Sequence, residues 1–159
     1  MRWPSNYPEG CPPADSYNAD GSLFRLANRS SYAPQDFLSA YALEVKRVDK
    51  GTIPEIRDEY SNCQARGLSV YRTYEDTVKA MLKIPSLSKK KALVEVDSNQ
   101  TGLLKNTPNK RNPSHYTWWI PNDIDLGSKV ISVHTKGQLR ESLNRLIEQD
   151  GELVGNSND

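Results

Sequence analysis

Apolar and polar residues alternate along several short stretches of the chain, and this alternation predicts strands. In Ser22–Leu26 it places Leu23 and Arg25 on one face and Phe24 and Leu26 on the other. Short apolar runs bounded by turn residues predict further strands at residues 68–71, 91–96, 103–104, 116–120 and 130–133.

A helical spacing of apolar residues predicts four helices between these strands. The first covers 36–45, although Tyr41, Leu43 and Val45 also alternate as they would in a strand. The third follows a capping box at Thr73 and ends at Pro85, with inward side chains at Val78, Met81 and Leu82. The fourth follows a similar box at Thr135 and ends at Gly151, with an apolar face of Leu139, Leu143, Leu146 and Ile147.

The second helix is predicted from Thr52 to Gly67. Thr52 and Glu55 have capping-box spacing, and Pro54 falls in the first turn, where its missing N–H is tolerated. Gly67 stands where a left-handed C-terminal cap is expected. The apolar stripe of this helix comprises Ile53, Ile56, Tyr60 and Cys63.

Short strands mixed irregularly with three or four helices favour an α+β fold, with one mixed, mainly antiparallel sheet and the helices packed against it. No glycine-rich phosphate loop follows a strand, which argues against nucleotide-binding folds of the Rossmann and P-loop types. We expect an extended proline-rich arm at 1–20, a single domain at 21–150 and a disordered tail at 151–159.

Composition limits the classes of function. The 159 residues carry 21 basic and 20 acidic side chains, a net charge of +1, so no overall field attracts nucleic acid or an anionic membrane. No apolar run is long enough for a membrane span, and the N-terminus lacks a signal-peptide pattern, so we expect a cytoplasmic protein. Reduced thiols are then expected at Cys11 and Cys63, although a single bridge between them stays open.

The segment Asn112–Pro121 concentrates the most distinctive chemistry. It holds His115 and, in a predicted strand, Tyr116 and Trp118 on one face with Trp119 on the other. Aromatic rings beside a histidine suit the stacking of a planar ligand and the transfer of a proton near neutral pH. Packing of both indoles, with His115 in a surface or satisfied loop position, is the structural alternative.

Other candidate groups lie on the predicted strands. Arg25, Ser69 and Arg72 supply guanidinium and hydroxyl groups that suit a phosphorylated ligand, although exposed strand residues are the simpler interpretation. Cys63 with His115 is a possible nucleophile and base, but its place on an apolar stripe favours an inert, buried thiol. The sequence shows no metal-ligand spacing and no cofactor motif, so we expect neither a metal nor a cofactor.

Residues 83–111 carry the chain's one local excess of positive charge. With the aromatic residues that follow, this stretch suits single-stranded nucleic acid, while a solvated lysine-rich turn is the alternative. The candidate contacts to nucleic acid are Lys89, Lys90, Lys91, Lys110 and Arg111.

Two resemblances follow from these residues. The segments Gly10–Ala14, Phe24–Leu26, Gly67–Arg72 and Ser114–Trp119 resemble segments of small bacterial proteins. The order of a strand arginine, a later strand serine and an aromatic-histidine loop resembles ADP-ribosyltransferase-like folds, which implies a nucleotide-like, NAD-type substrate. The chain departs from that pattern because it shows no clear catalytic glutamate and no NAD-binding motif.

Three functional hypotheses result. The first is a cytoplasmic accessory or regulatory domain that binds a protein or nucleic-acid partner through its aromatic segment and proline-rich arm. The second is an enzyme that acts on a nucleotide-like substrate with His115 as general acid and base. The third is a single-strand binder that uses the 89–111 basic stretch. The sequence leaves the oligomeric state open.

Overall fold

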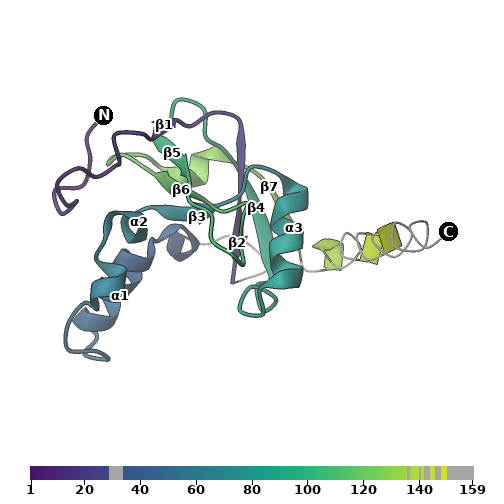
Figure 1. Cartoon of the computed structure of the whole chain (residues 1–159), viewed down its shortest axis with the longest axis horizontal. Coiled ribbons are helices and arrows are strands. Elements are labelled where there is room, and N and C mark those ends of the chain that lie inside the picture. Colours follow the sequence, from purple (N-terminus) through teal and green to yellow (C-terminus); the bar gives the residue numbers. More distant parts are fainter. Residues whose placement is uncertain (29–33, 136, 140, 142–143, 146–147, 150–159) are drawn as a thin grey trace.

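The strands of the described residues divide into two antiparallel sheets (Figure 1). This computed structural model describes residues 1–28, 34–135, 137–139, 141, 144–145 and 148–149. The first sheet has the order β1-β5-β6-β3, and the second has the order β2-β4-β7. Their bounds are Tyr17–Asn18 (β1), Leu103–Asn106 (β5), Tyr116–Trp119 (β6) and Leu68–Val70 (β3), then Ser22–Ala27 (β2), Ala92–Asp97 (β4) and Val130–Thr135 (β7).

One backbone pair joins the two sheets. Phe24 N–H donates to the Tyr71 carbonyl at 2.8 Å, and Tyr71 N–H donates back to the Phe24 carbonyl at 2.9 Å. On either side of this bridge, β2 continues in register with β4 while β3 pairs with β6. The α+β class is therefore confirmed, and its strands form two sheets rather than one.

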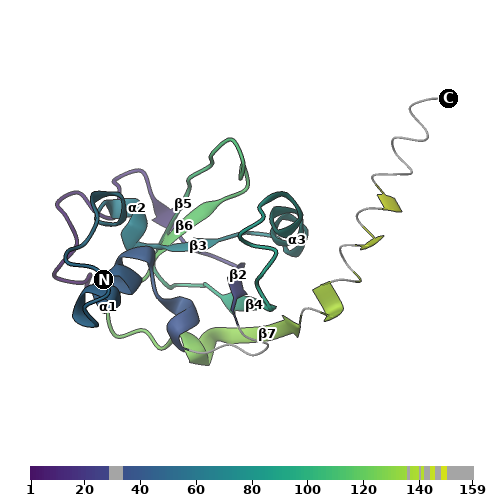
Figure 2. The ribbon, with the colours of Figure 1, turned by 90° about the horizontal axis from the view of Figure 1, so that it is seen from below.

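The helices lie on opposite sides of the strands. Helices α1 (Ala40–Asp49) and α2 (Cys63–Arg66) lie together on one side, and α3 (Tyr74–Lys83) lies on the other (Figure 2). Leu23, Val94 and Trp118 belong to the larger apolar core, whereas Phe24 and Leu93 pack with α3 residues in the second. Short 3₁₀ turns complete the order at Pro34–Phe37 (η1), Asp58–Tyr60 (η2) and Leu126–Lys129 (η3).

The first and third helices largely match the sequence pattern. The first begins at Ala40 rather than at residue 36, because the Ser39 side chain caps it by accepting from Ala42 N–H at 3.1 Å. In α3, Thr73 is the expected cap, and Val78 and Met81 are buried, but Leu82 is 44% exposed. The prediction of an inward Leu82 was wrong.

The helix predicted from Thr52 to Gly67 was also wrong, since only η2 and α2 are regular within it. Arg57 is extended, with φ −69° and ψ 142°, because its backbone N–H and guanidinium both bind the carboxylate of Glu44. Gly67 is extended rather than left-handed, and a Cβ there would lie 2.4 Å from Thr117 Cγ2. Close packing requires this glycine.

The end of the chain is only partly described. Leu139, on the predicted fourth helix, is fully buried in the second apolar core. Leu143, Leu146, Ile147, Gly151 and the predicted tail at 151–159 lie outside the described residues. Within the described residues, no helix is long and apolar enough to span a bilayer.

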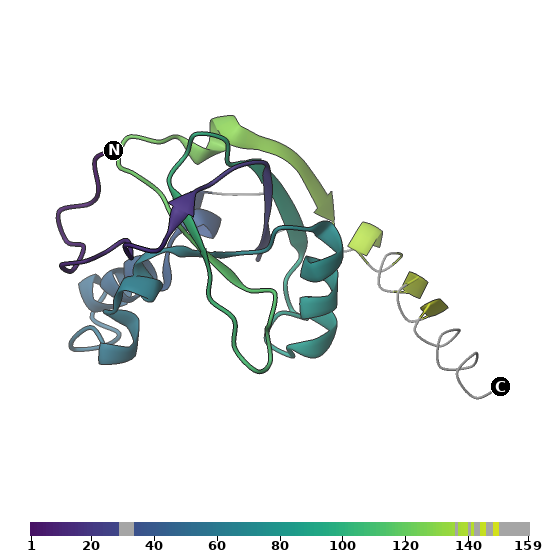
Figure 3. The same ribbon diagram turned by 45° about the horizontal axis from the view of Figure 1, so that its top comes forward.

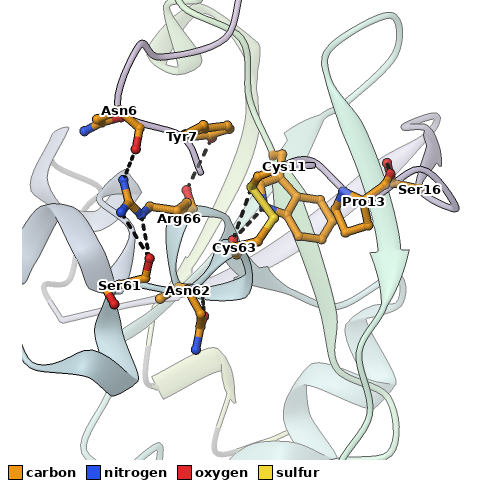
Figure 4. Close-up of a disulfide and its surroundings, with 11 residues drawn as sticks. Asn6, Tyr7, Cys11, Pro13, Ser16, Ser61, Asn62, Cys63 and Arg66 are labelled. Carbon is orange, nitrogen blue, oxygen red and sulfur yellow. Dashed lines mark hydrogen bonds between the residues drawn. A yellow bond between two sulfur atoms is a disulfide. The ribbon is translucent and has the colours of Figure 1, made fainter. Parts of the chain in front are cut away.

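The proline-rich arm is fastened to the body beside α1 and α2 (Figure 3). Its end pairs with the first sheet through β1, and Arg66 donates to the Asn6 carbonyl. A disulfide joins Cys11 to Cys63 at the start of α2 (Figure 4). The expectation of reduced thiols at these two positions was therefore wrong.

Replacing Glu44 tests the ion pairs of Glu44 with Arg47 and Arg57, which hold Arg57 extended where the second helix was predicted. The Glu44 side chain is fully buried, and its hydrogen bonds from Arg57, then from Arg47, lower its pKa from 4.5 to about 2. A lowered carboxyl pKa stabilises the fold above the unfolded pKa, and this stability is lost as the pH falls through the folded pKa. We expect Glu44→Gln to lower the urea midpoint at pH 7, and the deficit to shrink between pH 4.5 and pH 2.

The exposed Glu55→Gln is the matched control and should leave the midpoint unchanged. A pH-independent deficit for Glu44→Gln would contradict the ion-pair explanation.

Removing the disulfide should destabilise the chain. Closing a loop of sequence separation 52 restricts the unfolded state, which corresponds to about 4 kcal/mol in the chain-entropy model. Cys11→Ala with Cys63→Ala should lower the free energy of unfolding by roughly 2–5 kcal/mol. Urea unfolding with and without dithiothreitol checks this, and the reductant should affect only the wild-type chain. Equal stability of the wild type in both buffers would show that the bridge contributes nothing.

Candidate functional site

A cavity of about 510 Å³ opens where the two sheets diverge. Arg25 and Leu26 of β2 and Ser69 of β3 line it, just past the Phe24–Tyr71 bridge. Its walls also include residues from Leu38 to the start of α1, residues from η2 to Gly67, and Tyr71, Leu87 and Lys90. The cavity is thus built by residues far apart in sequence.

Ser69 lines this cavity and forms a hydrogen-bonded couple with His115, which is buried and does not itself line the cavity. The Ser69 side chain is exposed on β3, and its Oγ lies 2.8 Å from His115 Nε2. His115, only 9% exposed, places Nδ1 3.1 Å from the Thr107 carbonyl oxygen and 2.9 Å from Thr107 Oγ1. Because a carbonyl only accepts, Nδ1 carries the proton and Nε2 accepts from the Ser69 hydroxyl. This tautomer suits a base acting on Ser69.

The surroundings keep the imidazole neutral. Burial lowers the pKa of His115 below its ordinary 6.5, and the charge of Arg25 lowers it further, while the Thr107 carbonyl opposes the shift. Tyr71 packs edge-on against the imidazole, with ring centroids 6.3 Å apart. Tyr71 Oη in turn accepts from Asn112 Nδ2 at 2.6 Å. His115 is therefore both oriented and able to accept a proton at neutral pH.

Arg25 is held by backbone carbonyls. Its Nη1 donates to the Ser69 carbonyl at 2.8 Å, its Nη2 donates to Leu38 at 3.2 Å, and its Nε donates to Asp36. Burial lowers its pKa to about 10, so it stays charged at neutral pH. The guanidinium thus ties β2 to β3 and to the segment between η1 and α1.

The other predicted ligand-binding residues lie elsewhere. Arg72 pairs with Asp20 at 3.1 Å and lies 5.9 Å from the ring centroid of Tyr116, outside this cavity. Trp118 Nε1 donates to the Thr101 carbonyl at 2.8 Å, and this indole reaches a second cavity near α1. Trp119, 1% exposed, donates to the Cys63 carbonyl at 2.9 Å. Its ring is packed, as the structural alternative describes, and its role in stacking a ligand stays a prediction.

The basic residues also separate. Lys90 is half-buried and lines the cavity, whereas the other four are exposed, namely Lys89, Lys91, Lys110 and Arg111.

Cys63 is bonded to Cys11, so the proposed thiol nucleophile paired with His115 was wrong.

Sequence reasoning missed Thr107 and Tyr60. Thr107 lies just after β5, and its N–H donates to the His115 carbonyl at 3.0 Å, which fixes it opposite the histidine. Tyr60 lines the cavity, with the Arg57 guanidinium 4.7 Å from its ring centroid. Strand pairing determines where Thr107 lies, and the contacts of Arg57 with Glu44 and Tyr60 determine where Tyr60 lies. A local sequence pattern shows neither position.

Among the described residues, no group of three or more histidine, cysteine or acidic side chains is placed to hold a metal. Comparison with protein-family models, curated proteins and solved structures finds no match. The resemblance to ADP-ribosyltransferase-like folds therefore stays a prediction.

The neutral state of His115 can be measured directly. We expect its imidazole to titrate in NMR with a midpoint below 6.5, because burial disfavours the charged ring. The His115→Gln variant identifies the resonance by its loss. A midpoint at or above 6.5 would contradict the buried, Thr107-oriented arrangement.

Proposed function

We propose that this protein is an enzyme that transfers a group from a nucleotide-like substrate, using Ser69 and His115. The observation that carries the proposal is the 2.8 Å contact between His115 Nε2 and an exposed serine hydroxyl on a cavity wall. Thr107 supplies the group that orients the base, which completes a nucleophile, base and orienter in hydrogen-bond contact.

In the proposed chemistry, Ser69 is the nucleophile, and His115 acts first as base and then as acid. Ser69 Oγ attacks the electrophilic atom of an ester bond in the substrate and gives its proton to His115 Nε2, and the bond from that atom to the departing oxygen breaks. The imidazolium then returns this proton to the departing oxygen, and water releases the group from Ser69 by the same sequence of proton transfers. Arg25, fixed beside Ser69, holds the anionic part of the substrate.

The other two hypotheses stay predictions with less support. The accessory-domain hypothesis relied on Trp119, which is buried, and on an arm that the disulfide fastens to the body. For the single-strand hypothesis, Lys89, Lys91, Lys110 and Arg111 are exposed, but Lys90 is half-buried and lines the cavity. A cytoplasmic, bacterial protein also stays a prediction, and the disulfide weighs against the cytosol, where such bonds are rare.

Substitution of the couple tests the proposal. With a panel of nucleotides and dinucleotides as substrates and chromatographic detection of products, Ser69→Ala and His115→Gln should each lower turnover by about 10²–10⁴-fold, the usual contribution of general acid–base catalysis. Arg72→Gln is the matched control and should retain turnover, because Arg72 lies outside the cavity. Wild-type turnover by a folded Ser69→Ala variant would overturn the proposal.

A further inference from the structure

We propose that Arg25 and Lys90 together form a subsite for the phosphate group of the ligand. This inference deepens the proposed function, because it names the group that lies beside Ser69. Both side chains line the same cavity, although Lys90 follows α3 in the chain and Arg25 belongs to β2.

Arg25 supplies a fixed half of the subsite. Its bonds to the carbonyl oxygens of Asp36, Leu38 and Ser69 use three of its five N–H groups, and the charge of the nearby Asp36 carboxylate offsets part of its own. Two N–H groups are left for other partners. Because one bond goes to the Ser69 backbone carbonyl, Arg25 and Ser69 form adjoining parts of the cavity wall.

Lys90 supplies the second positive charge. It is half-buried, and its pKa is lowered first by this burial and then by the nearby charge of Arg25, while Asp36 opposes the shift. Two cations that repel each other in a partly desolvated cavity are stabilised when an anion binds between them. Doubly charged phosphate suits this position, since Arg25 offers directed N–H groups and Lys90 a point charge.

The remaining walls limit the ligand further. Glu59 also lines the cavity, so the lining holds one acidic residue beside the basic residues Arg25 and Lys90. The cavity of about 510 Å³ has room for more than phosphate alone. The ring of Tyr60, also on the wall, offers a planar surface for the rest of the ligand.

Titration with inorganic phosphate tests the subsite without turnover. We expect saturable binding by calorimetry to the full chain, weakened about tenfold or more by Lys90→Met. Lys89→Met and Lys91→Met are matched controls, since these neighbours are exposed, and should bind as the wild type. Equal binding by Lys90→Met and the wild type, equal weakening by all three variants, or no binding to the wild type would each overturn the subsite.

Two further ligands identify the source of the phosphate. Tighter binding of AMP than of ribose 5-phosphate, lost in Tyr60→Leu, supports a nucleotide, whereas equal binding supports a sugar phosphate on the same subsite. The two proposals fail separately. If phosphate binding depends on Lys90 but Ser69→Ala keeps full turnover, the subsite is retained and the catalytic couple is rejected. If Ser69→Ala loses turnover but phosphate binding does not depend on Lys90, only the couple is retained.

Discussion

The backbone pair between Phe24 and Tyr71 determines how the two sheets meet. Two hydrogen bonds join the sheets there, and past them the two strands separate toward different partners. Diverging strands leave backbone carbonyls that need donors. Arg25 supplies such a donor to the Ser69 carbonyl and also binds the Leu38 carbonyl between η1 and α1, so a residue that joins these segments also places a positive charge at the cavity.

The register of the first sheet places the Ser69 hydroxyl on the cavity wall and His115 within hydrogen-bond distance of it. Ser69 lies opposite Thr117, and Thr107 N–H donates to the His115 carbonyl, so Ser69, Thr107 and His115 come from three neighbouring stretches of chain. The Thr107 hydroxyl also contacts Thr117 Oγ1 at 2.7 Å. A shift of one residue in this register would turn Ser69 to the other face of the sheet and break the couple.

Local patterns predicted what depends on local interactions. Alternation gave the strand at Ser22–Leu26 with the correct faces, and the capping box at Thr73 gave α3. The helix at 52–67 could not be judged locally, because Glu44 holds Arg57 extended from another element. Likewise, residue type selected Arg25, Ser69 and His115, but strand pairing and tertiary packing determined which of the candidates meet.

The two ends of the cavity differ in how firmly they are held. On the α2 side, the disulfide at Cys63, the Trp119 bond to the Cys63 carbonyl and the close packing of Gly67 on Thr117 all fix the backbone. Lys90 instead reaches the cavity on a long side chain with many rotamers. In the proposed subsite, Ser69 and Arg25 are held in place, and only the Lys90 side chain has to become ordered when an anion binds. The anion then binds without moving Ser69 or His115.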